Sequence, residues 1–192
     1  AFAINYTEAQ KQQVVQMGAV PESYTLNRTG MNPLADILAT FKLAKKIKHI
    51  APDLVFSCFA KPVIFGTLAA RLAGVKQIVG MLEVLVYTFT EQPNGLSQKT
   101  KILQRVQVFL YKLSFRFLDK IIFLNPDDPQ DLVAKHNIKV KNIAVLGGIG
   151  LDLEQYPYVK PSLDAVSFIF IGRLLKEKGI NEFIAAAKIV KN

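Results

Sequence analysis

The stretch Ser167-Phe-Ile-Phe-Ile-Gly-Arg-Leu-Leu-Lys-Glu-Lys-Gly179 decides the fold class, because an apolar run passes into a basic loop just before a helical pattern. We expect Phe168–Ile171 to form a strand buried on both faces of a parallel sheet, followed by a helix over Ile180–Val190. Such strand–helix units are the repeating element of α/β proteins. Because one strand and one helix do not make a domain, we expect a second domain to begin here and to continue past Asn192.

The loop within this stretch has the composition of a phosphate-binding site. Gly172 would let the backbone approach a ligand at the carboxyl end of the strand, where parallel sheets bind ligands. Arg173 and Lys178 bring two cations to the same edge. Gly179 stands where the next helix begins, and the N-terminus of that helix would favour an anion. The alternative is an ordinary turn with solvated charges, and the spacing alone does not choose between the two.

The rest of the chain repeats the alternation of short apolar runs and helical patterns, which predicts a parallel sheet with crossover helices. The expected strands are Ala1–Ile4, Ser23–Leu26, Leu54–Phe59, Gln77–Leu82, Lys120–Leu124, Ile143–Leu146 and Ser167–Ile171. The expected helices are Glu8–Met17, Pro33–His49, Pro62–Ala73, Lys101–Leu118, Asp127–His136 and Ile180–Val190. Glycines and prolines punctuate the segment 147–165. We therefore expect a domain over residues 1–146, a linker over 147–165 and the start of a second domain over 166–192.

Composition limits the classes of function. Of the 192 residues, 51% are hydrophobic and 20% are charged, which suits a folded core. The net charge of +9 favours an anionic partner, which is a nucleic acid, a phosphorylated small molecule or an acidic membrane surface. Cys58 is the only cysteine and the two histidines are scattered, so we expect no metal site. No apolar window approaches the length of a membrane span.

Five segments carry a resemblance when they are taken together. They are Asn27–Pro33, Phe65–Gly74, Phe123–Asp128, Gly147–Asp152 and Gly172–Gly179, and they cover nearly the whole chain. In this order they resemble the family 4 glycosyltransferases, which are retaining enzymes of the GT-B architecture. The resemblance is greatest to the bacterial branch that extends lipid-linked oligosaccharides for capsules, O-antigens or protein glycosylation. It implies two Rossmann-like domains that face a cleft, with the nucleotide sugar held mainly by the C-terminal domain and the acceptor mainly by the N-terminal one.

The resemblance implies a Rossmann-like, doubly wound acceptor domain without its first strand, joined to the first strand–helix unit of the donor domain. Gly172, Arg173, Lys178 and Gly179 are then expected to bind the donor diphosphate, where the two cations offset the charge that builds on the leaving nucleotide. That role needs no metal, and no other cofactor is expected. The paired glutamates of the donor domain lie outside this sequence, so we expect the chain by itself to be inactive.

The chain departs from the family pattern after the expected strand Gln77–Leu82. Family members commonly carry a glutamate followed by Gly-Leu-Gly here, whereas this chain reads Glu83-Val-Leu-Val86. Valine is unfavourable at positive φ and fills space that a ligand or backbone would need, which leaves the geometry of this loop open. Glu83 stands where many family members place a cleft histidine. It is therefore a candidate catalytic or acceptor-binding residue, and a solvated loop carboxylate is the alternative.

Three further residues mark the expected acceptor side. Lys61 follows the expected strand Leu54–Phe59 at the carboxyl edge, where it would meet an acceptor phosphate. A solvated lysine at the start of a helix is the alternative. Asn27 and Arg28 end the expected strand Ser23–Leu26 at the same edge, where they are either acceptor-side residues or part of a turn and helix cap.

The expected helix Lys101–Leu118 carries two stripes at 100° per residue. Its apolar stripe, which we expect to face the core, consists of Leu103, Val106, Leu110, Leu113 and Phe117. Its basic stripe consists of Lys101, Arg105, Lys112 and Arg116. Beside the basic stripe fall Val108, Tyr111 and Phe115. We expect this outward side to lie on an anionic membrane surface, and an ordinary helix with a few exposed aromatic residues is the alternative.

Together these features predict a hexosyl- or N-acetylhexosaminyltransferase that moves a sugar from a nucleotide-sugar donor to a lipid-linked saccharide acceptor in bacterial polysaccharide or glycan biosynthesis. We expect it in the cytoplasm, bound peripherally to the inner face of the plasma membrane. One alternative is a non-catalytic basic module that binds nucleic acid or membrane. Another is a different GT-B enzyme, such as a sugar-nucleotide epimerase or a phosphorylase. We expect no nucleic-acid partner, because no recognised nucleic-acid motif accompanies the basic residues.

Overall fold

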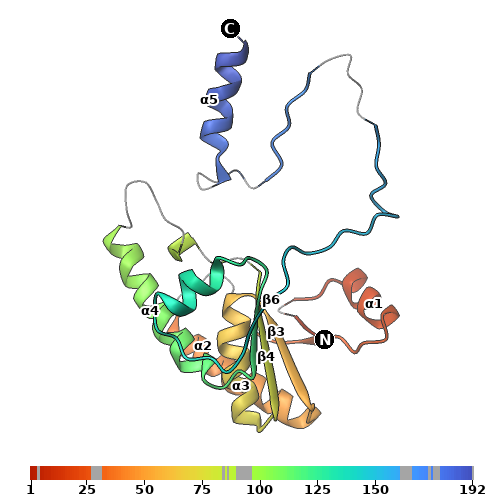
Figure 1. The fold of residues 1–192 in the computed structure, drawn as a ribbon. Coiled ribbons are helices and arrows are strands. Elements are labelled where there is room, and N and C mark those ends of the chain that lie inside the picture. The colour runs from red at the N-terminus through yellow and green to blue at the C-terminus, as the bar shows by residue number, and fades with distance from the viewer. Residues whose placement is uncertain are drawn as a thin grey trace. The chain divides into compact units, whose positions relative to one another are not determined.

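The computed structural model of the chain describes residues 1–3, 5–26, 32–83, 85, 87–89, 97–160, 166–172, 174 and 178–191. The chain divides into two units, Ala1–Ile149 and Gly150–Asn192. Figure 1 shows the elements of both units coloured in chain order. The domain limits predicted at residues 146 and 166 differ from this division, and they stay a prediction.

The first unit is built around a parallel sheet of four strands, hydrogen-bonded in the order β3-β4-β5-β6. These strands are β3 (Leu54–Cys58), β4 (Gln77–Leu82), β5 (Lys120–Phe123) and β6 (Ile143–Val145). One row of paired residues crosses the whole sheet, and it consists of Ser57, Gly80, Ile121 and Ile143. Sequential parallel strands joined by helices confirm the predicted α/β class and its Rossmann-like character.

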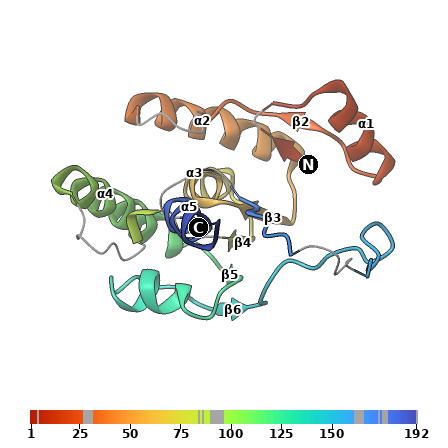
Figure 2. The same cartoon turned by 90° about the horizontal axis from the view of Figure 1, so that it is seen from above.

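Each crossover between neighbouring strands of this sheet contains a helical segment. The segments are α3 (Ala60–Ala73), α4 (Gln98–Phe115) and the π-helical turn η2 (Pro129–Ala134). All of them lie on one face of the sheet, and α2 (Pro33–Ile50) packs beside α3 (Figures 1 and 2). Helix α3 approaches β3 so closely that a Cβ at Gly66 would lie 2.7 Å from the Ser57 hydroxyl oxygen. A larger residue at position 66 would therefore clash with Ser57.

The core of the first unit lies between the sheet and these helices. Alternate strand residues point toward the helices, and Leu82, Ile121 and Phe123 are at most 1% exposed. On the opposite face of β3, Leu54 and Phe56 are 44% and 50% exposed. The sheet therefore has one buried face and one face that is partly open at β3.

A separate two-stranded parallel sheet pairs β1 (Phe2–Ala3) with β2 (Glu22–Ser23), and α1 (Glu8–Gln16) joins the two strands. Lys46 of α2 holds this sheet, because its Nζ donates to the Ser23 carbonyl oxygen at 2.7 Å and contacts a Glu22 carboxylate oxygen at 3.2 Å. These two strands form a parallel sheet of their own, apart from the four-stranded one. The outer edge of β3 pairs with no strand among the described residues.

The helix of the second unit is α5 (Ile180–Lys191), as predicted. The predicted strand Ser167–Ile171 is wrong, because these residues form no strand, and Phe168, Ile169 and Ile171 are 74%, 78% and 86% exposed. A strand needs a partner for its backbone groups, and the described part of this unit contains no other strand. Instead, the Phe170 ring packs against Phe183 of α5 with 5.5 Å between the ring centroids.

The starts of the helices follow local signals in the sequence. The Asn32 side chain accepts from the Ala35 N–H and caps α2, and Pro33 occupies the first helical turn as predicted. Ser97 caps α4 in the same way, which places the start of that helix at Gln98 rather than at the predicted Lys101. The predicted helix 127–136 is shorter and π-helical.

Candidate functional site

The carboxyl edge of the four-stranded sheet brings together the ends of β3 and β4. Phe59 follows β3 with φ 71° and ψ 158°, a conformation that only glycine adopts readily. Its N–H donates to the Met81 carbonyl oxygen of β4 at 3.1 Å, and its own carbonyl accepts from the Val63 N–H of α3 at 2.9 Å. These bonds hold a strained residue at the edge where parallel sheets bind ligands, with its side chain 59% exposed.

Lys61 lies at the same edge, in the first turn of α3, and forms an ion pair with a buried acid. Its Nζ lies 3.1 Å and 3.0 Å from the two carboxylate oxygens of Asp36 on α2. The side chains of Lys61 and Asp36 are 26% and 8% exposed. The Lys61 ammonium also lies 5.9 Å from the centroid of the Phe65 ring. Lys61 is therefore half-buried and held in place by the buried carboxylate rather than fully solvated, and its role toward an acceptor stays a prediction.

Glu83 directly follows β4 at this edge and is half-buried. Its negative charge is felt at the end of β3, since burial first and the Glu83 charge second raise the pKa of the Cys58 thiol. Glu83 and Cys58 thus lie at the ends of the neighbouring strands β4 and β3, at the same edge of the sheet. Its catalytic or acceptor-binding role stays a prediction. Val84 and Val86, which replace the family glycines, lie outside the described residues.

The end of β5 adds another acid to the carboxyl edge. Asn125 starts a turn in which its side-chain oxygen accepts from the Asp127 N–H at 2.9 Å. Asp128 is buried, with 7% exposed, and its pKa is raised by burial and then by the charges of Asp131 and Asp127. A carboxyl group with a raised pKa holds its proton to higher pH than an exposed one.

Sequence patterns did not predict Asp36, Phe59 and Asp128 as members of this edge. For Asp36 a signal was present, because it shares a helical stripe with the buried residues Thr40 and Leu43. A carboxylate on the apolar face of an amphipathic helix requires a partner. Phe59 carried no comparable signal, because the backbone conformation of a phenylalanine is set by its tertiary contacts.

The predicted donor loop is only partly described. Lys178 is exposed two residues before α5, and Gly179 between them has φ 78°, a left-handed conformation that favours glycine. The Gly179 carbonyl accepts from the Phe183 N–H at 2.9 Å and so begins the helix. Gly172 is exposed, whereas Arg173 lies outside the described residues, as do Asn27 and Arg28 of the predicted acceptor side. Binding of a donor diphosphate stays a prediction.

The basic stripe of α4 is exposed as predicted, at Lys101, Arg105, Lys112 and Arg116. The assignment of Val108 and Phe115 to the same outward side is wrong. Phe115 is fully buried, and Val108 is half-buried and packs against the core. The exposed apolar residues of this helix are instead Ile102, Val106 and Phe109, at 60%, 50% and 64%.

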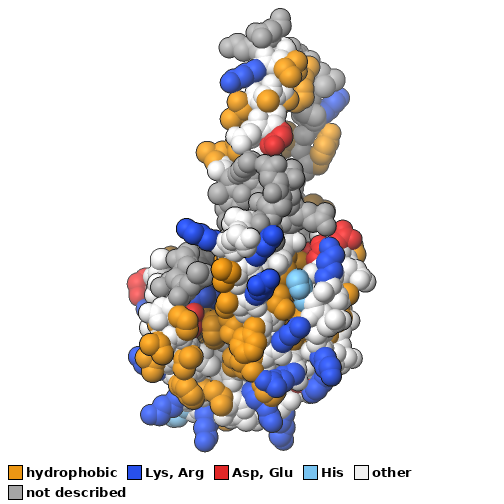
Figure 3. Space-filling view, turned by 90° about the vertical axis from the view of Figure 1, so that its left-hand side faces the viewer, with side chains coloured by type: hydrophobic (Ala, Val, Ile, Leu, Met, Phe, Trp, Pro, Cys, Tyr) orange, Lys and Arg blue, Asp and Glu red, His pale blue; other side chains and the backbone are white. Residues whose placement is uncertain are grey.

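A short 3-10 turn before α4, η1 (Tyr87–Phe89), determines which side of the helix is buried. The Phe89 ring packs against Tyr111 of α4 with 6.2 Å between centroids. The Gln104 amide donates to the Thr88 carbonyl oxygen at 2.7 Å. These contacts turn Tyr111 and Phe115 inward and leave Val106, assigned to the core by periodicity, half-exposed. Figure 3 shows this side of the molecule, where hydrophobic side chains gather beside Lys and Arg side chains.

In the described part of the chain, no helix combines the length and the apolar character that crossing a membrane requires. Within the same residues, no group of three or more His, Cys, Asp or Glu side chains is arranged to hold a metal ion.

A comparison with known proteins gives one family match and two relatives. The model of a family described as "Glycosyl transferase 4-like" matches residues 5–125. These residues contain Lys61, Glu83 and most of the first unit.

Two relatives of known activity also match. One is the N,N'-diacetylbacillosaminyl-diphospho-undecaprenol alpha-1,3-N-acetylgalactosaminyltransferase of Campylobacter jejuni, which is 26% identical over 204 residues, covering 100% of this chain and 53% of that protein. The other is the UDP-Gal:alpha-D-GlcNAc-diphosphoundecaprenol alpha-1,3-galactosyltransferase of Escherichia coli. It is 27% identical over 168 residues, covering 82% of this chain and 40% of that protein. The chain thus spans about half the length of these relatives or less.

Proposed function

Because this chain belongs to the glycosyl transferase 4-like family, we propose that the whole protein is a glycosyltransferase that moves a sugar from a nucleotide-sugar donor to a lipid-linked saccharide acceptor. The similarity along 100% of the chain to the Campylobacter jejuni transferase is the observation that supports this most strongly. The names of both relatives include diphospho-undecaprenol. On this proposal the transferred sugar is a hexose or an N-acetylhexosamine, and the product enters bacterial polysaccharide or glycan biosynthesis.

In this proposal the carboxyl edge of the first unit receives the acceptor. Glu83 would accept a hydrogen bond from an acceptor hydroxyl group, and the Lys61 ammonium would face an acceptor phosphate. Asp36 offsets the lysine charge but also fixes its position, so the pair offers an oriented N–H donor rather than a mobile cation. The exposed Phe59 ring provides an apolar surface at the same edge for a sugar ring.

The donor diphosphate would bind at the start of α5. Lys178 would provide a positive charge and Gly179 would let the backbone come close, with Gly172 and Arg173 completing the loop. The helix N-terminus adds its partial positive charge. On this proposal the cations balance the charge of the departing nucleotide diphosphate without a metal ion.

We also propose that the exposed side of α4 docks reversibly on the anionic inner face of the plasma membrane. Lys101, Arg105 and Lys112 are exposed along it, and each basic residue near an anionic surface contributes about 1 kcal/mol. Ile102 and Phe109 are exposed beside them and can enter the interface region of the bilayer.

The transferase proposal is tested with the whole protein, UDP-linked hexoses and N-acetylhexosamines, and a synthetic polyprenyl-diphosphate-linked sugar. Mass spectrometry should show the acceptor lipid gaining one sugar. Glu83→Gln and Lys61→Met should each lower kcat/KM by at least about tenfold, since each removes a charge-assisted hydrogen bond. Lys42→Gln on the exposed side of α2 is the control. Conversion of the donor to an epimer, with no lipid product, would contradict the proposal.

The docking proposal is tested by sedimentation with vesicles. The chain should sediment with phosphatidylglycerol vesicles at low salt, should ignore phosphatidylcholine vesicles, and should be released as ionic strength rises. Replacing Lys101, Arg105 and Lys112 by glutamine should abolish sedimentation while circular dichroism stays unchanged. Equal binding by this variant would rule out α4 as the docking side.

A further inference from the structure

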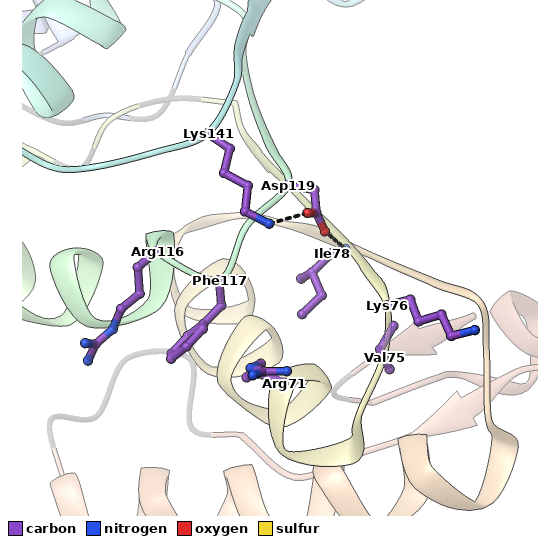
Figure 4. Close-up of a pocket in the computed structure, with 8 residues that line it drawn as sticks. All are labelled: Arg71, Val75, Lys76, Ile78, Arg116, Phe117, Asp119 and Lys141. Atoms are coloured by element: carbon purple, nitrogen blue, oxygen red, sulfur yellow. Dashed lines mark hydrogen bonds and ion pairs between the residues drawn. The ribbon is translucent and has the colours of Figure 1, made fainter.

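A pocket of about 290 Å³ opens at the amino edge of the four-stranded sheet, at the opposite end of the strands from Glu83. Its lining comes from the end of α3, the end of α4, and the residues that lead into β4, β5 and β6 (Figure 4). Four of the lining residues are cations, namely Arg71, Lys76, Arg116 and Lys141. Among the described residues that line the pocket, Asp119 is the one acid. Segments far apart in sequence thus bring an excess of positive charge to one hollow.

The acid neutralises only one of these cations. One Asp119 carboxylate oxygen lies 2.7 Å from the Lys141 ammonium, and the other accepts from the Ile78 N–H at 2.9 Å. The Lys141 bond first and the Ile78 bond second lower the pKa of Asp119, so it stays ionised and engaged. Within the described part of the chain no acid pairs with Arg71, Lys76 or Arg116. An anion is what the remaining charge would attract.

The Phe117 ring positions two guanidinium groups at the pocket. The Arg71 and Arg116 guanidinium carbons lie 5.7 Å and 5.1 Å from its centroid, so both cations stack on one aromatic side chain. Figure 4 shows Phe117 between the two arginines. The Arg116 Nε–H donates to the Leu113 carbonyl oxygen at 3.1 Å, so this arginine would offer a ligand its terminal N–H groups. A guanidinium held against a ring loses less side-chain entropy when a ligand binds.

A simpler explanation accounts for part of this arrangement. Arg71 and Arg116 lie at the ends of α3 and α4, where cations interact favourably with the helix dipole in any protein. That explanation applies to each arginine separately, but not to Lys76 and Lys141, which come from loops before β4 and β6. The helix-dipole explanation also predicts that the pocket binds no phosphate, so a binding experiment distinguishes the two explanations.

We propose that this pocket binds a phosphate group, carried either by a soluble phosphate compound or by the headgroup of an anionic phospholipid. Planar guanidinium groups match the tetrahedral oxyanion with paired N–H donors, and Lys76 adds a further charge. The site does not depend on the proposed transferase activity, because it lies at the other edge of the sheet from the acceptor side.

The first test is a titration of the ¹⁵N-labelled chain with inorganic phosphate, followed through the side-chain Nε–Hε signals of arginine. Arg71 and Arg116 should shift along a saturable curve. The double variant Arg71→Gln/Arg116→Gln should weaken binding at least about tenfold, since it removes charge-assisted hydrogen bonds. Lys42→Gln/Lys45→Gln removes the same charge from exposed positions on α2 and should leave the curve unchanged.

A further variant protects this test against misfolding and against a purely electrostatic effect. Arg71→Lys/Arg116→Lys keeps the charge but loses the fork geometry, so it should keep the fold and still bind phosphate more weakly. No saturable shift in the unaltered chain would overturn the proposal. An equal loss in the α2 control pair would also overturn it, because binding would then reflect net charge alone.

The source of the phosphate group is decided with phosphatidylglycerol vesicles. If a headgroup occupies the pocket, Arg71→Gln/Arg116→Gln should reduce sedimentation with these vesicles more than the α2 pair does, and inorganic phosphate should compete. If the two double variants sediment alike while phosphate still saturates Arg71 and Arg116, the ligand is a soluble phosphate compound. If phosphate gives no saturable shift and the two double variants sediment alike, the proposal is overturned and the helix-dipole explanation is sufficient.

Discussion

Leu54–Cys58 and Ser167–Ile171 are both short apolar runs that precede a helix, yet only the first is a strand. By composition the second is the stronger candidate, since after its serine it reads Phe-Ile-Phe-Ile. β3 pairs along its whole length with β4, whereas Phe168 and Ile169 are 74% and 78% exposed. The difference teaches that a strand forms where a partner strand presents its backbone, and that propensity alone is insufficient.

The two runs also differ in what covers them. The sheet of the first unit is packed by α3 and α4, and Phe115 of α4 and Leu118 after it share one core with Ile121 and Phe123. In the described part of the second unit, Phe170 and Phe183 form an aromatic pair and α5 is the one helix. Matched substitutions in the two regions therefore distinguish the effect of burial from the effect of strand propensity.

The largest expected difference is between Phe123→Ala and Phe168→Ala. Phe123 is fully buried, so its truncation should lower the free energy of unfolding by about 3–5 kcal/mol. Phe168 is exposed, so the same truncation should change it by less than about 0.5 kcal/mol. Denaturant unfolding followed by circular dichroism measures both. A large loss at Phe168 would mean that the second run is paired and buried in solution, which would break the comparison.

Two lysines near helix starts give the next difference. Lys61→Met leaves the buried Asp36 carboxylate without its ion pair and should cost about 1–3 kcal/mol, a range that allows for the partial exposure of the lysine. Lys178→Met, at an exposed position, should have almost no effect. Chemical denaturation of both variants gives the values.

The double variant Asp36→Leu/Lys61→Met is the control for the ion pair. It removes both charges at once and should recover most of the stability lost in Lys61→Met. If the double variant is no more stable than Lys61→Met, the loss arises from packing of the lysine stem and the ion pair contributes little.

The positive-φ residues that follow the two runs should respond in opposite directions. Phe59→Gly should raise the stability of the first unit by about 0.5–1 kcal/mol, because it relieves a conformation that suits glycine while removing an exposed ring. Gly179→Ala should lower the helicity of α5, because φ 78° costs about 1 kcal/mol for an alanine. Thermal unfolding and far-UV circular dichroism measure the two effects. Destabilisation by Phe59→Gly would show that the ring has contacts that outweigh the strain.

The smallest expected effect is a difference in how stability depends on pH at the two edges of the four-stranded sheet. The lowered pKa of Asp119, due first to Lys141 and then to the Ile78 N–H, gives stability that is present above the ordinary aspartate pKa and is lost as pH falls through the folded value. The raised pKa of Asp128, due first to burial, gives stability that is present below the ordinary value and is lost as pH rises through the folded one.

Asparagine variants at these two positions should therefore change the pH profile of unfolding with opposite signs. Asp128→Asn should stabilise the protein at neutral pH relative to acid pH, whereas Asp119→Asn should do the reverse. Melting temperatures from acid to neutral pH test this. Parallel profiles for the two variants would show that neither carboxyl group is linked to folding.

Much of the fold could be predicted because its signals are local. The start of α2 follows from Asn32 and Pro33, and the strands β4 and β5 follow from apolar runs bounded by polar residues. The resemblance drawn from five ordered segments agrees with the family match over residues 5–125. Caps and apolar runs depend only on residues close together in the sequence, so the sequence alone reveals them.

The candidate site was predicted less completely. Lys61 was identified from its place after a strand and Glu83 from the family resemblance. The partner of Lys61 was not identified, because Asp36 comes from a different helix. Periodicity also placed Val106 in the core and Phe115 on the outward side of α4, whereas Val106 is 50% exposed and Phe115 is buried. Apolar residues occur around most of that helix, and the contacts of Phe89 and Thr88 then selected the side that Tyr111 occupies.

By itself the sequence determined where helices and most strands occur, that the class is α/β, that the family is glycosyl transferase 4-like, and that the chain carries a net charge of +9. Only the tertiary structure decided that Ser167–Ile171 stays unpaired, that Phe115 is buried, and that Arg71 and Arg116 meet at one phenylalanine ring. The physical reason is that helix periodicity and capping act between residues a few positions apart. Strand pairing, burial and convergence of charge depend on partners that only folding brings together.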